Sequence, residues 1–109
     1  MEYILDIQGF QKCQNDYIVK ELAILEVQDS SMPMVFTFKP PTFWSQLSVD
    51  EKCTARWLEM SFHGIRWNSG TIPYDQLSDI LHKYLKNAKK IFIKGIQKKK
   101  FLTKILPEM

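Results

Sequence analysis

The sequence is poor in cysteine and has no long apolar run. Its two cysteines, Cys13 and Cys53, match neither the paired CxxC spacing of a zinc site nor the density of a secreted disulfide scaffold, so we expect two free thiols. No stretch approaches the roughly 20 apolar residues that cross a bilayer, and the first residues lack the order of a secretory signal. We therefore expect an intracellular protein of the cytoplasm or nucleus, with no membrane partner.

Acidic residues are scarce in the last quarter of the chain, where Glu108 is the only one after Asp79. The same segment contains no arginine but is rich in lysine: Lys83, Lys86, Lys89, Lys90, Lys94, Lys98, Lys99, Lys100 and Lys104. Such a cluster attracts anions and is suited to a phosphate backbone, although lysines also form ordinary solvated surface on helices and strand edges. Both interpretations of the basic end stay open.

The composition is that of one globular domain spanning residues 1–109, since 45% of the residues are hydrophobic and 13% aromatic. Two β-rich apolar runs, Tyr3–Phe10 and Tyr17–Val27, are joined by the polar turn "QKCQND" and predict an antiparallel hairpin. A third run, Met34–Lys39, is stopped by Pro40 and Pro41, which cannot donate to a strand ladder. The first third of the chain is therefore expected to be a three-stranded antiparallel meander.

Helical signals follow. Ser48 and Glu51 have the S-x-x-E form of a capping box, and the helix that starts there is expected to turn Cys53, Trp57 and Met60 inward, with Leu58 as a further candidate. "SFHGIRWNSG" is expected to be a loop. After Pro73 a second amphipathic helix is expected to bury residues at helical spacing: Leu77, Ile80, Leu81, Tyr84 and Leu85.

The lysines at 89–94 bracket the strand-like triplet "IFI", which Gly95 separates from a last helix. The apolar residues of that helix that we expect inward are Phe101, Leu102, Ile105 and Leu106. The complete order is β-β-β-α-α-β-α, an α/β fold with a mixed sheet. Because Ile91–Ile93 follows helices and must cross over, we predict that it lies beside the Asp6 strand and parallel to it, with Tyr17–Val27 on the other side.

This order, with certain residues, resembles the DEDD exonuclease branch of the ribonuclease H-like superfamily, and it is similar to uncharacterised exonuclease-like reading frames of insect genomes. The residues that carry the resemblance are the pair Asp6-x-Gln8, the run Glu21–Leu25, the turn His63-Gly64-Ile65, the segment Ile72-Pro73-Tyr74 and the pair Phe101-Leu102. The resemblance covers nearly the whole chain. It implies a ribonuclease H-like fold and descent from a metal-dependent 3'-5' exonuclease.

In the family, an Asp-x-Glu pair on the first strand holds two divalent ions, because residues two apart on a strand share a face. Here Asp6 matches the first acid, Gln8 replaces the second, and Lys98 stands where a further Asp would begin a helix, near Lys94 in the place of an Asn. Glutamine brings no charge and a lysine repels the ion. We therefore expect no catalytic residues and no bound metal. Asp6 is the one candidate metal ligand, and Mg²⁺ or Mn²⁺ is expected only if the protein is an active exonuclease.

Asp6, Gln8 and Lys98 are then remnant positions. We expect Asp6 to be a buried group, paired with a lysine such as Lys98 that replaces the missing metal charge. The family's last catalytic Asp and its general-base residue would lie beyond Met109, so the chain is expected either to be part of a longer protein or to have a reduced fold.

Three functions remain open. The leading hypothesis is an inactive exonuclease-like module that binds a protein partner or, weakly, single-stranded nucleic acid through Lys94, Lys98, Lys99 and Lys100, where Gly95 leaves amides open at a helix start. The first alternative is an active exonuclease whose missing acids come from Glu21, Asp75 or Asp79. The second is a structural, self-associating subunit.

Histidines and tryptophans give weaker signals. His63 and His82 lack an acid or cysteine at ligand spacing and are expected in surface or loop roles. Trp57 is expected in the core, and Trp44 and Trp67 are expected to be exposed in loops, where they are candidate anchors for a partner.

Overall fold

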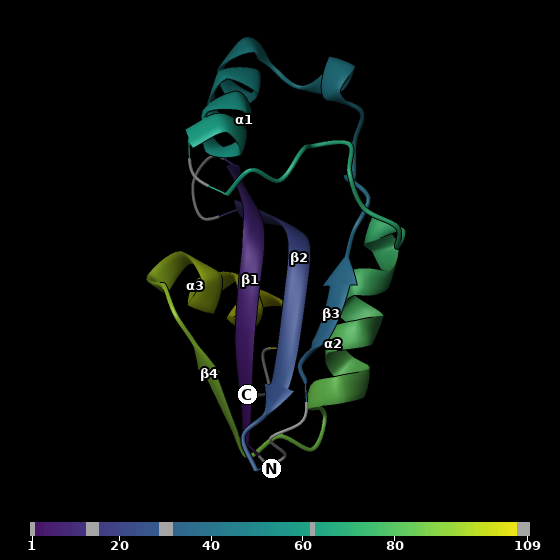
Figure 1. Ribbon diagram of the computed structural model, residues 1–109, viewed down its shortest axis with the longest axis vertical. Helices are drawn as coiled ribbons and strands as arrows, with labels where there is room; N and C mark the ends of the chain where they lie inside the picture. The colour runs from purple at the N-terminus through teal and green to yellow at the C-terminus, as the bar shows by residue number, and fades with distance from the viewer. Residues whose placement is uncertain (1, 13–15, 29–31, 62, 107–109) are drawn as a thin grey trace.

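The computed structural model describes residues 2–12, 16–28, 32–61 and 63–106 (Figure 1). The strands are β1 (Glu2–Lys12), β2 (Asp16–Glu26), β3 (Met34–Thr37) and β4 (Lys90–Ile93). The α-helices are α1 (Val49–Ser61), α2 (Leu77–Leu85) and α3 (Ile96–Ile105), and the short 3-10 helices are η1 (Trp44–Gln46) and η2 (Tyr74–Gln76). The predicted order of strands and α-helices is confirmed.

The strands form one mixed sheet in the order β3-β2-β1-β4. β2 is antiparallel to both β1 and β3, as a meander requires, whereas β4 is parallel to β1. The long connection through α1 and α2 allows this, because it carries the chain from the β3 edge to the opposite edge before β4 begins. The prediction that Ile91–Ile93 lies beside the Asp6 strand and parallel to it is confirmed.

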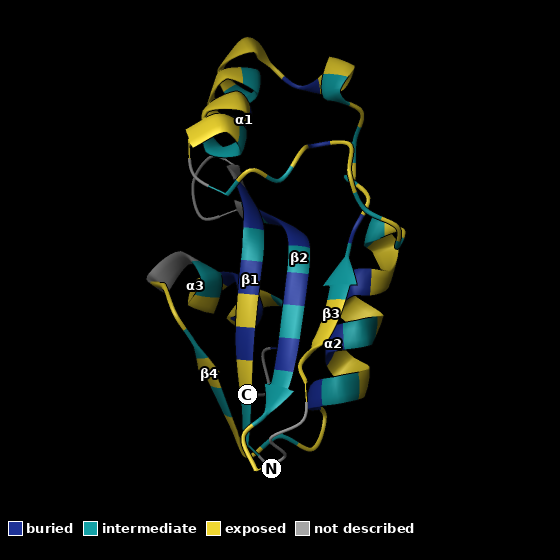
Figure 2. Cartoon of the chain, viewed as in Figure 1, coloured by how far each residue is buried: buried dark blue, intermediate teal, exposed yellow. Residues whose placement is uncertain are grey.

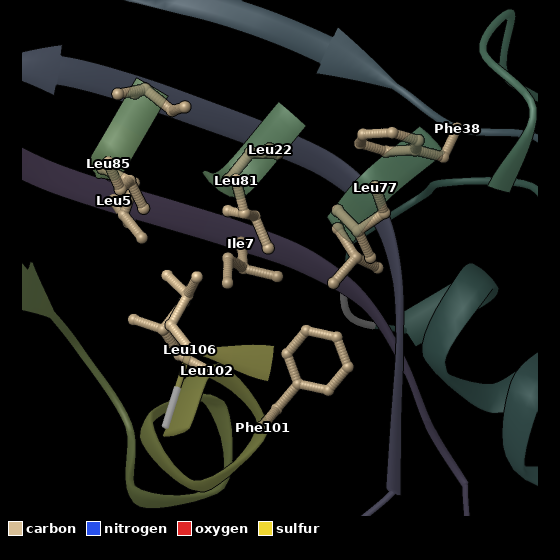
Figure 3. Close-up of a cluster of buried hydrophobic side chains, with 12 residues drawn as sticks. Leu5, Ile7, Leu22, Phe38, Leu77, Leu81, Leu85, Phe101, Leu102 and Leu106 are labelled. Carbon is tan, nitrogen blue, oxygen red and sulfur yellow. The ribbon is translucent and has the colours of Figure 1, made fainter. Parts of the chain in front are cut away.

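Both α2 and α3 cover the same face of the sheet. Side chains alternate along β1, so Leu5 and Ile7 point to that face, while Ile4, Asp6 and Gln8 point to the other. In Figure 3, leucines of α2 and of α3 converge on Ile7 from two sides. The labelled core residues there are Leu5, Ile7, Leu22, Phe38, Leu77, Leu81, Leu85, Phe101, Leu102 and Leu106. The inward residues that the sequence predicts for α2 and α3 all belong to this cluster or pack against it.

A second, smaller cluster lies at the end of β1 and β2, on the opposite face of the sheet. It consists of Phe10, Ile18, Leu47, Ala55 and Trp67. In Figure 1 this region, with η1 and α1, forms the upper end of the molecule. The predicted capping box starts α1, because the Glu51 amide donates to Ser48 Oγ at 3.1 Å and the Ser48 amide donates to the Glu51 carboxylate at 2.9 Å.

The inward face predicted for α1 is wrong. Cys53, Trp57 and Met60 are exposed. Leu58 packs against the second cluster as expected, and Ala55, which the sequence did not indicate, is buried in it. The reason is that this small cluster contacts only a narrow face of α1. An apolar stripe of four residues is therefore left on the outer side of the helix: Val49, Cys53, Trp57 and Met60. The free thiol predicted for Cys53 is confirmed, whereas Cys13 lies outside the described residues.

The roles predicted for two tryptophans are reversed. Trp67 is only 3% exposed, although it lies in a loop, because its ring packs on Phe10 and its indole N–H donates to the Thr42 carbonyl at 3.0 Å. Trp57, predicted in the core, is 60% exposed. Trp44 is half-buried beside Trp67, so it is not the exposed anchor that the sequence predicts.

Part of the Asp6 face of the sheet stays open to solvent among the described residues. Ile4 and Phe92 pair across β1 and β4, and Asp6 lies in line with Ala23 and Val35. Ile4, Asp6, Val35 and Phe92 are all exposed. Figure 2 shows exposed segments in yellow on β1, β3 and β4. We call these four residues the open sheet face. None of the described helices is long and apolar enough to cross a membrane.

Candidate functional sites

Asp6 and Gln8 share the face predicted for the family's metal pair. Asp6 is exposed and Gln8 is half-buried. The strand register places Glu21 directly opposite Gln8, so its side chain joins the same face. The other two acids considered above, Asp75 and Asp79, belong to η2 and α2, of which α2 covers the opposite face. The site therefore combines two carboxylates and one amide.

The predicted pairing of a buried Asp6 with Lys98 is wrong. Asp6 is exposed, and Lys98 belongs to α3, whose Phe101 and Leu102 pack on the face of the sheet that Asp6 points away from. Because side chains alternate along β1, Asp6 points away from the face of Leu5 and Ile7 that α3 covers, and the sheet lies between the two charges. In the described parts of the chain, no three His, Cys, Asp or Glu side chains gather closely enough to hold a metal ion.

The basic end of the chain builds a groove on the far side of the sheet. A cavity of about 620 Å³ lies between the end of α2, strand β4 and helix α3. Its basic lining residues come from all three places: His82, Lys86, Lys89, Lys90 and Lys99. Among the lining residues that the structure describes, none is acidic. We call this cavity the basic groove, and its four lysines make it a site for anions.

Aliphatic side chains form the rest of the basic groove. They are Leu85, Ala88, Ile91, Ile93, Leu102 and Leu106, with Thr103 as a polar neighbour. No aromatic ring is among the lining residues, so the groove offers no platform on which a base would stack. An anion bound there would be held by its charge, with its apolar parts on the aliphatic floor.

The structure brings only one of the four predicted binding lysines into the groove. Lys99 lines it, whereas Lys94 and Lys100 are exposed outside it and Lys98 is half-buried on α3. The groove follows the middle and end of α3, through Thr103, and so does not lie at the helix start behind Gly95 where the sequence predicts a phosphate. The sequence did not lead us to expect that the end of α2 and the start of β4 also line the groove. The pattern that could have indicated it is the group of lysines that flank "IFI".

A second feature that sequence reasoning missed is a buried lysine. Lys20 is 1% exposed, and its Nζ donates to the carbonyls of Phe38 at 2.8 Å, Trp67 at 2.7 Å and Ser69. Gln8 pairs with Glu21 and Gly9 with Val19, so Lys20 is the extra residue of a β-bulge. A bulge redirects a side chain, and here it accompanies a lysine turned toward the loop at 67–69.

Lys20 holds parts of the chain together but is not placed for chemistry. Burial lowers the pKa of its ammonium to about 8, a range in which lysines serve as nucleophiles or bases. Yet an ammonium has three donors, and all three are used on backbone carbonyls within a site closed to solvent. We therefore read it as a clamp that ties β2 to the end of β3 and to the loop at 67–69. The sequence feature that could have indicated this buried lysine is the single cation in the run "YIVKELAILEV".

His63 also has a structural role, in the loop where the sequence predicts it. Its Nδ1 accepts the Ile65 amide at 2.9 Å, so the proton is on Nε2, which donates to the Gly9 carbonyl at 2.8 Å. Its ring packs edge-on against Phe10. The two hydrogen bonds occupy both nitrogens, and the imidazole is not offered to a metal or a substrate.

No family model matches the chain, and no curated protein or solved structure is significantly similar to it. The function is therefore inferred from the fold, the basic groove and the carboxylates of Asp6 and Glu21.

Proposed function

We propose that the chain is a ribonuclease H-like module that has lost two-metal chemistry and acts by binding, with single-stranded nucleic acid held at the basic groove. The observation that carries the binding proposal is the groove lining, in which one histidine and four lysines from three places face the cavity and none of the described lining residues is acidic. The groove supplies positive charge and, among its described lining residues, no stacking surface, so it would contact the phosphate backbone and not the bases.

The fold part of the proposal draws support from topology. The strand order β3-β2-β1-β4, with β4 parallel to β1, is the arrangement that the family resemblance implies. Loss of chemistry draws support from Gln8, which brings no charge to the expected metal site, and from Lys98, which belongs to a helix on the other face. Two-metal catalysis needs several carboxylates around both ions.

Binding should be strongly salt-dependent. If the four groove lysines each contact one phosphate, the logarithm of affinity falls with the logarithm of salt at a slope of about −3 for a single strand. Between 50 and 200 mM salt, that slope corresponds to a loss of about 50-fold. We would measure it by fluorescence anisotropy with labelled oligo-dT and oligo-rU.

A matched pair of charge reversals locates the site. Lys89→Glu with Lys99→Glu changes two groove residues, and Lys94→Glu with Lys100→Glu makes the same change in charge at exposed positions outside the groove. We expect the groove variant to lose about tenfold or more at low salt and the control to lose much less. Equal losses would show a diffuse attraction with no defined site, and absence of binding in the wild type would favour a protein partner.

An active exonuclease is the second candidate, favoured by one observation. Glu21 lies across from Gln8 and supplies a second carboxylate on the Asp6 face. If the site works, Mg²⁺ or Mn²⁺ should raise the melting temperature, since an ion that binds only the folded state stabilises it. Our proposal predicts no such rise and no metal-dependent degradation of DNA or RNA. Activity that survives repurification and disappears in both Asp6→Ala and Glu21→Ala would overturn it.

A further inference from the structure

Helix α1 presents an apolar stripe to solvent. Val49, Trp57 and Met60 are 76%, 60% and 79% exposed, and Cys53 is exposed between them. With 100° of rotation per residue, these four positions fall within an arc of about 80° on one side of the helix. The inner side of α1 is already used, since Ala55 and Leu58 face the second cluster. The stripe is thus a separate surface, and exposed apolar patches of this kind mark interaction sites.

We infer that α1 pairs with α1 of a second copy of this chain, antiparallel, through this stripe. A two-fold axis at position 55 places Cys53 opposite Trp57 of the second copy and brings Val49 within one residue, about 1.5 Å along the helix, of the position opposite its Met60. The stripe reads small, small, large, large along the helix. Only the antiparallel arrangement sets each large side chain against a small one, which two packed helices require to interdigitate at 8–10 Å.

The charges around the stripe permit this contact. The nearest cation on the helix, Arg56, has its guanidinium 5.6 Å from the ring centroid of Trp44, a cation–π contact that engages it within its own chain. Lys52 and Glu59 are half-buried, between the stripe and the inner side of α1. No charged residue belongs to the stripe itself, and the exposed Asp50 and Arg56 lie about 20° beyond its two edges, at the solvated rim of the contact.

The size of the helix sets the strength of the dimer. α1 has 13 residues and is therefore about 20 Å long. A single pair of such helices lies at the low end of specific interfaces, below about 1,200 Å² of buried surface. We expect a weak dimer that dissociates on dilution, with a dissociation constant in the micromolar range or above.

The open sheet face is the competing surface for self-association, because Val35 is 56% exposed there. We would determine the average mass by sedimentation equilibrium from micromolar to millimolar protein. The wild type and Val35→Lys should both dimerise as concentration rises, and Trp57→Lys should remain a monomer. A wild type that stays monomeric throughout, or a dimer lost in Val35→Lys and kept in Trp57→Lys, would overturn the inference. Circular dichroism would establish that each variant is folded.

A size swap tests the antiparallel register directly. Cys53→Trp alone sets two large rings against each other, and Trp57→Ala alone leaves two small residues, so each should weaken the dimer. The two changes combined restore a large residue opposite a small one and should recover dimerisation toward the wild-type level. If the combined variant dissociates as readily as the single ones, the proposed register is wrong. This test is independent of nucleic-acid binding, because none of these residues lines the basic groove.

Discussion

Gly70 is the position where a single added methyl group should do most damage to the Lys20 clamp. Its φ is +118°, and a Cβ built there would lie 2.0 Å from the Phe38 carbonyl oxygen. That oxygen accepts one hydrogen bond of Lys20, and the residue before Gly70, Ser69, accepts another. A Cβ atom essentially never lies within 3.0 Å of a non-bonded heavy atom, so Gly70→Ala must move the two backbones apart by about 1 Å.

The expected cost follows from these contacts. An alanine at this φ is strained by about 1–3 kcal/mol, and a displacement of 1 Å stretches the 2.8 Å bond from Lys20 to Phe38 past hydrogen-bonding range. A buried polar group left without its partner costs about 1–3 kcal/mol. Together these terms predict that Gly70→Ala lowers the free energy of unfolding by about 2–6 kcal/mol.

Gly64 provides the matched control. Its φ is also positive, at +70°, but a Cβ there would meet nothing within 4 Å. Gly64→Ala should therefore cost only the backbone strain, about 1–2 kcal/mol. Equilibrium unfolding in urea, followed by tryptophan fluorescence and circular dichroism, measures both variants. If the two variants lose the same stability, the close approach of Gly70 to Phe38 and its part in the clamp are refuted.

Two further predictions concern stability. The folded-state pKa of Lys20 is about 8 and its unfolded value is 10.5, so the unfolded state binds more protons between these values and stability should rise with pH there. From pH 8 to 9.5 the free energy of unfolding of the wild type should increase by up to about 2 kcal/mol relative to Lys20→Met. Tyr17, whose pKa is raised to about 12, acts in the opposite direction only above this pH range. Parallel pH profiles of the two proteins in urea unfolding would contradict this prediction. Ser48→Ala should lose about 1 kcal/mol with the capping box, while Ser45→Ala, in η1 with no such role, should stay near the wild type; equal melting temperatures would show that the box contributes nothing.

The sheet could be predicted because local signals agree with the global arrangement. β-rich apolar runs define the first three strands, Pro40 and Pro41 end the third, and a short apolar triplet after two helices has to cross over to a parallel position. The core-facing sides of α2 and α3 follow in the same way, since each carries one apolar stripe that has one sheet to cover.

The orientation of α1 could not be predicted, since that helix has apolar residues on two sides. The larger set, with Trp57 and Met60, suggests the core, but the second cluster accommodates only Ala55 and Leu58. Periodicity measures how apolar a helix face is and not what lies opposite it. The same limit explains the reversed roles of Trp57 and Trp67.

The candidate sites could not be predicted for a different reason, which is that each is assembled from residues of several elements. The Lys20 clamp depends on a β-bulge and on carbonyls 18 to 49 residues away, none of which leaves a sequence pattern. The basic groove assembles residues from 82 to 106, so the sequence shows the excess of lysine without showing which lysines converge. Of the four lysines predicted as the binding site, only Lys99 lines the groove.

The most direct test of the central claim is to map where a single strand of nucleic acid binds. In an NMR titration of ¹⁵N-labelled protein with a short oligonucleotide at low salt, we predict amide shifts confined to residues 82–93 and 99–106, around the basic groove, and reversed by added salt. Residues of the open sheet face such as Asp6, together with Gln8 and Glu21, should not shift. Shifts centred on Asp6, Gln8 and Glu21, or none at any protein concentration, would contradict the account.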